Sequence, residues 1–196
     1  MFPLLRKPNT LGRTLTWNLP AGKSCPGAGK CREFCYARKG CFVFSSVTKA
    51  HKANLWLSRQ NFFPTTAINW LWKRTKTPEY IRLHSSGDVY SQAYLSKLTQ
   101  IATFNPKIKF YLYTKSLHLN WKEFDELPNT ARVVSMGGKH DSLAFSDPQH
   151  HMCPVCVVAD DDKHLEWLLS VGYVDGTDDD GVAACGTNPC IVLRKH

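Results

Sequence analysis

The sequence lacks a long apolar run. No stretch of its 196 residues approaches the roughly 20 consecutive apolar residues that a membrane-spanning helix needs. The first residues, Met1 to Pro8, also lack the apolar segment of a secretion signal. We therefore expect no membrane partner, and we expect the chain to stay in a reducing cytoplasm, where cysteines bind metals more often than they form disulfides.

Acidic side chains are almost missing from the first part of the chain. Residues 1–59 hold eleven Lys and Arg but only one acid, Glu33, while residues 158–196 carry an acidic excess within the net charge of +9. In one interpretation the basic half faces an anion such as a nucleic acid, a nucleotide or a phosphate-bearing substrate. In the other, several of these charges offset a cluster of thiolates and sulfides, and the rest are solvated.

Familiar catalytic motifs are also missing, since no Ser–His–Asp arrangement, phosphate-binding glycine motif or internal repeat stands out. A hydrophobic content of 43% and a charged content of 21% are ordinary for a globular protein. The length suits one compact domain. Within it we expect two parts: residues 1–150, and a cysteine-rich lobe at residues 151–196 that packs on the first.

Apolar periodicity predicts alternating strands and helices. The predicted strands cover residues 11–19, 79–84, 108–113 and 131–135. Helices are predicted from Ser46, from Pro64 to about Lys76, after a cap at Ser91, and after a capping box formed by Asn120 and Glu123. This alternation is typical of an α/β protein with a mostly parallel sheet.

The predicted strands end in small polar or glycine residues. These ends are Ser85–Asp88, Thr114–Ser116 and Ser135–Gly138, and the first strand leads into a cysteine-rich loop. Ligands of parallel α/β sheets bind beyond the carboxyl ends of the strands, so we expect these segments to meet at one site. The simpler alternative is that each segment only forms a turn.

The cysteine-rich loop holds four of the eight cysteines: Cys25, Cys31, Cys35 and Cys41. Thiolates are ligands that zinc and iron–sulfur clusters prefer, and the loop glycines would let backbone N–H groups turn toward sulfur. Four thiolates would close a structural site, whereas three would leave an open position for a substrate or cofactor. The spacing does not choose between three and four, and Cys41 is equally compatible with a buried free thiol.

A second cysteine group lies near the end of the chain. Cys153 and Cys156 form one pair, and Cys185 and Cys190 form a second pair. The two pairs are separated by 28 residues. Four thiolates in two such pairs meet the requirement of a tetrahedral zinc ion or a four-cysteine iron–sulfur cluster. We therefore expect this group to hold a metal in the C-terminal lobe, and the spacing leaves the metal open.

Three blocks in this order resemble a known family. Residues 24–37, residues 81–91 and residues 109–116, followed by the two late cysteine pairs, resemble the phage gene-product-88 family over about residues 9–190. That family in turn resembles a reduced radical S-adenosylmethionine (radical SAM) enzyme. The resemblance implies a partial (β/α) barrel with mostly parallel strands and a C-terminal metal-binding lobe.

The resemblance also implies roles for individual residues. A first [4Fe–4S] cluster would be bound by Cys25, Cys31 and Cys35. Residues at the site of the methionyl amine would be Ser86, Gly87 and Asp88, and the rest of the S-adenosylmethionine site would be lined by Thr114, Lys115, Ser116 and Ser135. An auxiliary cluster would be held by Cys153, Cys156, Cys185 and Cys190. The loop departs from the usual C-x3-C-x2-C spacing, because its third thiolate comes from upstream Cys25.

Taken together with the cysteine patterns, the resemblance implies a phage iron–sulfur enzyme of radical SAM type in the infected host cell. It would act on a nucleotide or nucleic-acid-related substrate and receive electrons from a donor. One alternative is a non-enzymatic iron–sulfur protein whose clusters stabilise the fold or transfer electrons. Another is a zinc-stabilised nucleic-acid-binding protein, which would use the basic half and the aromatic side chains.

Overall fold

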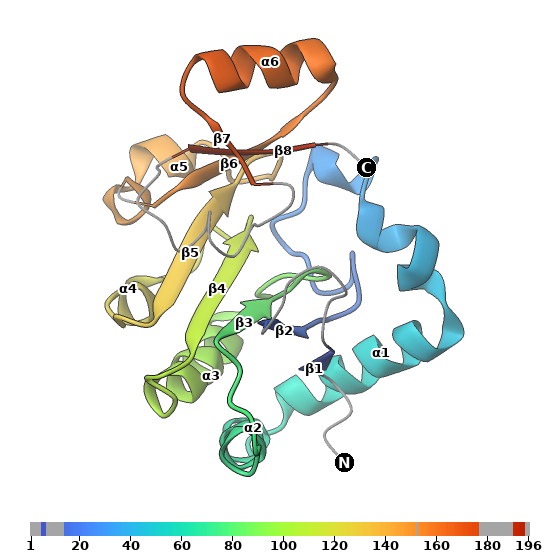
Figure 1. The fold of residues 1–196 in the computed structure, drawn as a ribbon, viewed down its shortest axis with the longest axis vertical. Helices are drawn as coiled ribbons and strands as arrows, with labels where there is room; N and C mark the ends of the chain where they lie inside the picture. Colours follow the sequence, from blue (N-terminus) through green and yellow to red (C-terminus); the bar gives the residue numbers. More distant parts are fainter. Residues whose placement is uncertain (1–4, 7–13, 152, 177–189, 195–196) are drawn as a thin grey trace.

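The computed structural model describes residues 5–6, 14–151, 153–176 and 190–194, and it is a mixed α/β fold built on one curved sheet (Figure 1). The sheet has eight strands in the order β1-β2-β3-β4-β5-β6-β8-β7. The strands are β1 (Leu5–Arg6), β2 (Thr14–Trp17), β3 (Tyr80–Leu83), β4 (Lys109–Thr114), β5 (Thr130–Ser135), β6 (Val155–Ala159), β7 (Val174–Asp175) and β8 (Cys190–Arg194). Only β1 pairs antiparallel, and the other seven strands are parallel, as expected.

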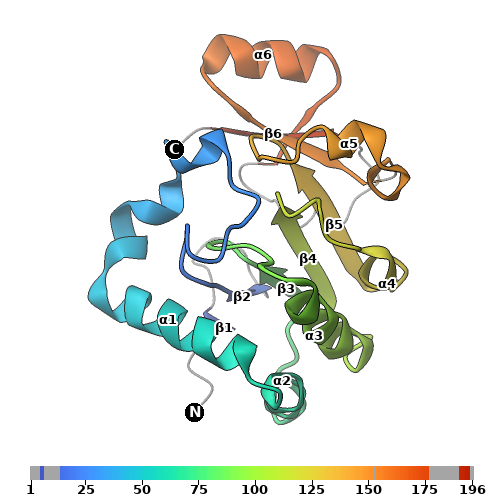
Figure 2. The same ribbon diagram turned by 180° about the vertical axis from the view of Figure 1, so that it is seen from behind.

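Strands β2 to β6 lie side by side in chain order. A doubly wound sheet reverses its order partway, whereas this order is that of a (β/α) barrel. Right-handed connections then place the intervening helices on one face of the sheet, and views from opposite sides show them outside its curve (Figure 2). The helices are α1 (Ser45–Arg59), α2 (Phe63–Trp72), α3 (Gln92–Thr103), α4 (Lys122–Asp125), α5 (Leu143–Ser146) and α6 (Asp162–Ser170). Within the described ranges no helix has the length and apolar character to cross a membrane.

The two faces of the sheet differ in character because side chains alternate along each strand. The outer face packs on α2 and α3 and carries Leu15, Trp17, Ile81, Leu83, Phe110 and Leu112, all buried. The inner face carries Arg82 and a group of tyrosines that includes Tyr111 and Tyr113. Burying each large apolar side chain of the outer face contributes about 1.5–3 kcal/mol, so this face holds most of the core.

The helix starts test two sequence predictions. The Ser91 side chain accepts a hydrogen bond from the Tyr94 N–H at 3.3 Å, which confirms the predicted cap of α3. The predicted capping box of Asn120 and Glu123 is half present. The Asn120 side chain accepts a hydrogen bond from the Lys122 N–H at 3.1 Å, as a cap does, although the helix itself starts at Lys122. The reciprocal bond to Glu123 is absent, because the Asn120 N–H donates to the Gln92 side-chain oxygen at 2.9 Å instead.

The C-terminal segment is not a separate lobe in the described residues. Strands β6 and β8 continue the main sheet, since Val155 pairs with Val134 of β5 and with Cys190 of β8. Both segments contain a short apolar run, which is typical of a buried parallel strand. The boundary between residues 1–150 and 151–196 stays a prediction.

Candidate functional site

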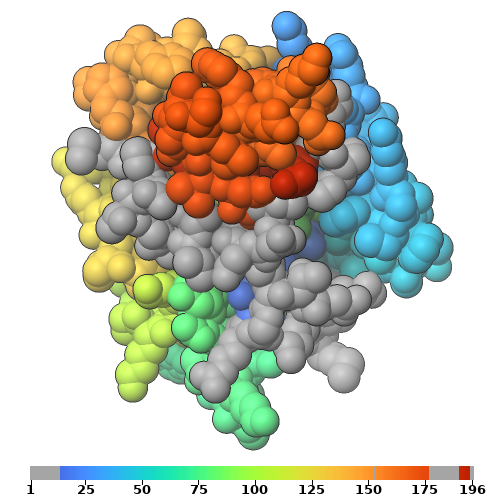
Figure 3. All heavy atoms as spheres, turned by 45° about the horizontal axis from the view of Figure 1, so that its top comes forward, coloured from blue at the N-terminus to red at the C-terminus, as the bar shows by residue number. Residues whose placement is uncertain are grey.

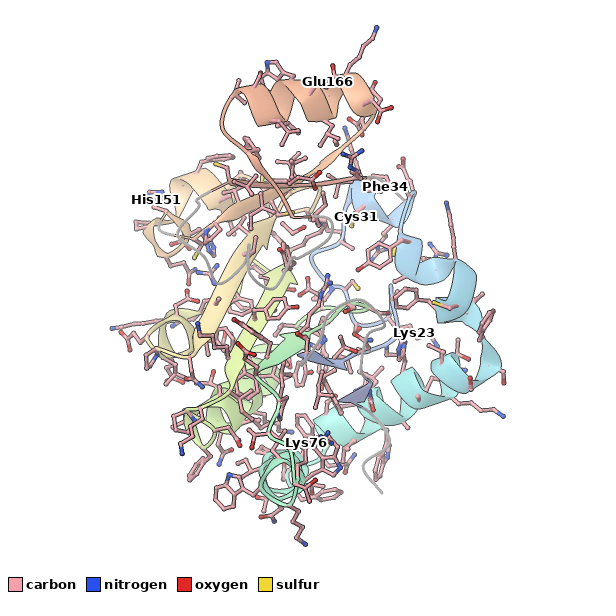
Figure 4. All side chains as sticks on the ribbon, in the orientation of Figure 1. Lys23, Cys31, Phe34, Lys76, His151 and Glu166 are labelled. Atoms are coloured by element: carbon pink, nitrogen blue, oxygen red, sulfur yellow. The ribbon has the colours of Figure 1, made fainter. Side chains whose placement is uncertain are left out.

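A cavity of about 770 Å³ opens at the carboxyl ends of β3, β4 and β5. The cysteine loop forms one wall, and the polar strand ends form the other. Figure 4 labels Lys23, Cys31 and Phe34, which lie along this loop and belong to the cavity wall. The expected convergence of the loop and the strand ends at one site is therefore what the structure shows.

Close backbone contacts hold the cysteine loop against the strand ends. Ala28 forms an antiparallel bridge with Gly138, and the Lys139 N–H donates to the Gly27 carbonyl at 2.8 Å. A Cβ atom at Gly27 would lie 2.1 Å from the Lys115 carbonyl oxygen, so no larger residue fits there. The sequence suggested that the loop glycines serve the sulfur atoms, whereas here Gly27 is needed for this close approach.

Three thiols share the cavity. Cys25, Cys31 and Cys35 line it and are partly buried, whereas Cys41 is exposed and is not part of the wall. Burial raises the pKa of Cys25 to about 11, with smaller contributions from the Asp88 carboxylate and from the other two thiols. Cys25 therefore lies within electrostatic reach of both other thiols, and a metal bound at Cys25 would displace its proton.

The described residues do not form a ready site for a metal ion. In the described part of the chain, no three His, Cys, Asp or Glu side chains lie close enough to bind one metal ion. Ligands of a zinc ion must converge on one point, whereas each thiolate of a [4Fe–4S] cluster binds a different iron. Cys25, Cys31 and Cys35 line one cavity without forming such a group.

The turn after β3 is tightly fixed behind the loop. Gly87 has a φ of +85°, and a Cβ atom there would lie 2.5 Å from the Ser24 Oγ. The Ser86 hydroxyl donates to the Leu19 carbonyl at 2.8 Å. The Asp88 N–H donates to the Ser24 carbonyl at 3.1 Å, which ties the turn to the start of the cysteine loop.

Asp88 is the buried carboxylate of this site. It accepts hydrogen bonds from the Thr114 hydroxyl at 2.7 Å and from the N–H groups of Lys115 at 2.9 Å and Val89 at 2.7 Å. Burial raises its pKa above the ordinary value, although these donors and the Lys115 ammonium oppose the shift. The side chain is 5% exposed and forms part of the cavity wall, so it can still meet a ligand.

The other predicted cofactor-binding residues fall into two groups. Lys115 and Ser135 line the cavity, together with Ser86, Gly87 and Asp88, and the Lys115 ammonium donates to the Ser135 hydroxyl. Thr114 and Ser116 are fully buried behind the wall. The Ser116 hydroxyl donates to the Val89 carbonyl at 2.7 Å. The two groups thus differ in access, and their roles toward a cofactor stay predictions.

The second cysteine group does not come together in the described residues. Cys190 pairs with Val155 and so shares its face of the sheet, whereas Cys156 points to the opposite face. Cys156 is 1% exposed in an apolar cluster, and Cys153 packs in a different one. Cys185 lies outside the described residues. The predicted metal site of the C-terminal lobe therefore has no support here, because strand alternation separates its ligands.

His84 directly precedes the Ser85–Asp88 turn and is not among the predicted site residues. It is 5% exposed on the cavity wall and has a φ of +69°, a conformation that non-glycine residues rarely adopt. Its Nε2 lies 3.3 Å from the Tyr94 hydroxyl, which accepts from Trp17 Nε1 at 2.8 Å. Its Nδ1 has no hydrogen-bond partner in the described structure, and burial lowers its pKa to about 3.

Arg82 is a second cavity residue that is not among the predicted site residues. It lies on the inner face of β3, and its guanidinium stands 5.6 Å from the centre of the Tyr113 ring. Both residues line the cavity. The available signal was the alternation of β3, where the charged residue stands between the buried residues Ile81 and Leu83 and must face the other way.

Comparisons with known proteins agree on one family. The family model described as Gene product 88 matches residues 4–196. The Gene 88 protein of Mycobacterium phage L5 is 27% identical over 135 residues, which is 60% of this chain and 56% of that protein. The chain thus spans little more than half the length of this curated relative. No solved structure matches the chain.

Proposed function

The chain belongs to the Gene product 88 family, which includes a phage protein, and we propose that it is an iron–sulfur enzyme of radical SAM type. Cys25, Cys31 and Cys35 are the proposed ligands of a [4Fe–4S] cluster with one open iron. The observation that carries the proposal is the position of these three thiols on one cavity, opposite the polar strand ends. A role in the cytoplasm of an infected cell and an electron donor stay predictions.

The residues of the wall suit an amino-acid-like cofactor. When bound, a cluster with an open iron supplies the single electron that cleaves the C–S bond of S-adenosylmethionine. The Asp88 carboxylate can accept the methionyl amine, since one buried anion next to a bound ammonium is stabilised. The Lys115 ammonium and the Ser135 hydroxyl can donate to the carboxylate or ribose oxygens. The cysteine loop forms one wall of the cavity beside these groups.

An auxiliary cluster is not part of this proposal. Cys156 and Cys190 lie on opposite faces of the sheet. They therefore cannot bind the same cluster without a rearrangement of β6 or β8. The proposal therefore expects about four irons per chain rather than about eight.

The first experiment is anaerobic purification followed by a visible absorption spectrum and by iron, sulfide and zinc assays. We expect a brown protein that loses its iron when Cys25, Cys31 or Cys35 is replaced by Ser. The matched control is Cys41→Ser, which should keep full iron content because this thiol lies outside the cavity wall. A colourless protein with stoichiometric zinc would refute the cluster and favour a zinc-stabilised module.

The second experiment separates an enzyme from an inert cluster protein. The loaded protein is reduced with dithionite and mixed with S-adenosylmethionine, and products are followed by chromatography. We expect 5′-deoxyadenosine from the wild type and much less from Asp88→Asn, whose neutral amide no longer stabilises an ammonium group. A stable cluster that never yields a cleavage product would leave a structural or electron-transfer role instead.

A further inference from the structure

Helix α1 carries a stripe of exposed basic and aromatic side chains. Lys49, Lys52, Trp56 and Arg59 follow one another at intervals of three, four and three residues, which places them on one side of the helix. The Trp56 side chain is 61% exposed. The helix contains no Asp or Glu, whereas a merely solvated helix face usually mixes charges of both signs.

The stripe continues toward the cavity. Between β2 and α1 the chain exposes basic side chains, Lys23, Lys30, Arg32, Arg38 and Lys39, and exposed aromatic side chains, Tyr36 and Phe44. Lys23, Arg32 and Arg38 belong to the cavity wall. Figure 3 shows residues 30–59, coloured blue to cyan, as one flank of the molecule. We call the exposed basic and aromatic residues of 23–59 the basic flank.

We propose that the basic flank binds a single-stranded nucleic acid and leads one of its nucleotides to the cavity. This inference deepens the proposed function by naming its substrate class, and it rests on that function for the chemistry but not for the binding.

The α1 part of the flank distinguishes substrate binding from charge compensation. Lys49, Lys52 and Arg59 are not part of the cavity wall, so they do not offset charge on thiolates inside it. A surface with eight basic residues and one acid in residues 14–59 instead attracts a polyanion. The charge therefore matches a phosphate backbone that runs outside the cavity.

The aromatic side chains favour a single strand over a duplex. Unpaired bases stack on exposed aromatic rings, which contributes about 1–3 kcal/mol per base, whereas the bases of a duplex are already stacked. The stripe from Lys49 to Arg59 is about 15 Å long, which gives room for a few nucleotides of an extended strand. The cavity of about 770 Å³ lies within the usual range for a small-molecule site, and Lys23, Arg32 and Arg38 of the basic flank line it.

The test measures the fluorescence anisotropy of short labelled oligonucleotides, one of DNA and one of RNA, with the anaerobically purified full chain. We expect the affinity to fall steeply with salt. The triple variant K49Q/K52Q/W56A should bind at least ten-fold more weakly, and its slope of log affinity against log salt should be shallower by about 1.4.

The chain offers a matched control outside the basic flank. Trp72 is also 61% exposed, and Lys73 and Lys76 are exposed near it in sequence. Figure 4 labels Lys76 below Lys23 and Cys31 of the cysteine loop. The variant W72A/K73Q/K76Q removes the same groups and should bind like the wild type. Because all six positions are exposed, circular dichroism melts should show both variants folded.

Each outcome decides a separate point. Equal weakening by both triple variants, or no binding at low salt, would overturn the proposal. Tighter binding of a duplex than of a single strand would refute the stacking role of the aromatic residues. A preference between the two oligonucleotides identifies the strand as DNA or RNA. The triple variant of α1 should keep its iron, and an iron-free cysteine variant should keep its affinity for the oligonucleotides, so the two proposals fail independently.

Discussion

The buried His84 gives a quantitative test of how the cavity wall is built. Burial lowers its pKa from 6.5 to about 3, so the folded protein keeps this side chain neutral where the unfolded chain would protonate it. The stability that depends on neutral His84 is therefore fully present above pH 6.5 and is lost as the pH falls toward 3. At pH 4.5, two pH units below 6.5, the loss from this residue is about 3 kcal/mol.

The substitution His84→Asn removes the titration and keeps the backbone. Asn tolerates a φ of +69° better than other non-glycine residues, and its amide does not titrate. At pH 7 the variant should lose about 1–2 kcal/mol, since it forfeits ring packing and the hydrogen bond to Tyr94. Between pH 6.5 and 4.5, however, it should lose about 3 kcal/mol less than the wild type.

The assay is urea unfolding followed by tryptophan fluorescence at a series of pH values. The informative quantity is the difference between the two curves of unfolding free energy against pH, because all other titrating groups are shared. His118→Asn serves as a control, since His118 is mostly in water and its lowered pKa should matter less. Parallel curves for the wild type and His84→Asn would show that His84 is not buried as a neutral ring, and the argument would fail.

Four further substitutions test the packing of the cysteine loop and of the strands behind it. Gly27→Ala should cost about 1–3 kcal/mol of unfolding free energy and lower the iron content, because its Cβ would meet the Lys115 carbonyl at 2.1 Å; unchanged iron content would contradict the close approach. Asn129→Asp should cost about 3 kcal/mol in urea unfolding, since the Asn129 amide nitrogen donates to three backbone carbonyls at 3.0–3.1 Å that a carboxylate would repel. Arg132→Ala should lower the free energy of unfolding by about 3–5 kcal/mol, because it leaves the carboxylate of Asp125 without its bidentate partner. Lys122→Ala removes only the exposed pair with Glu126 at 4.0 Å and should lower it by less than about 1 kcal/mol. Similar values for the two variants would refute the role of burial.

The position of the first cysteine group could be predicted from the sequence for a topological reason. Parallel strands end at the same edge of a sheet, so a loop that follows β2 must meet the turns that follow β3, β4 and β5. Asp88 and Lys115 line the cavity with Cys25 as that rule requires. The rule does not predict which side chains are accessible from the cavity. Thr114 directly precedes Lys115, but it is fully buried behind the wall.

Contacts between distant segments could not be read from local patterns. The αL conformation of His84 and the approach of Gly27 to Lys115 depend on how the loop packs against strands that lie far away in the sequence. The capping box at α4 shows the same limit. The local half, from Asn120 to Lys122, forms as predicted, whereas the Asn120 N–H bonds to Gln92, which lies 28 residues earlier in the chain, rather than to Glu123.

Each cysteine group contains four cysteines. Whether their side chains can meet depends on the backbone conformation of the segment that carries them. Cysteines in an irregular loop can all turn toward one side, so Cys25, Cys31 and Cys35 reach a common cavity. On a strand, successive side chains point to opposite faces of the sheet. Because Cys190 pairs with Val155, it lies on the face opposite to that of Cys156. A pair of cysteines with metal-like spacing therefore predicts a metal site only where the segment is not also a strand of the core. The short apolar run from Val155 to Ala159 was the sequence signal that argued for a strand.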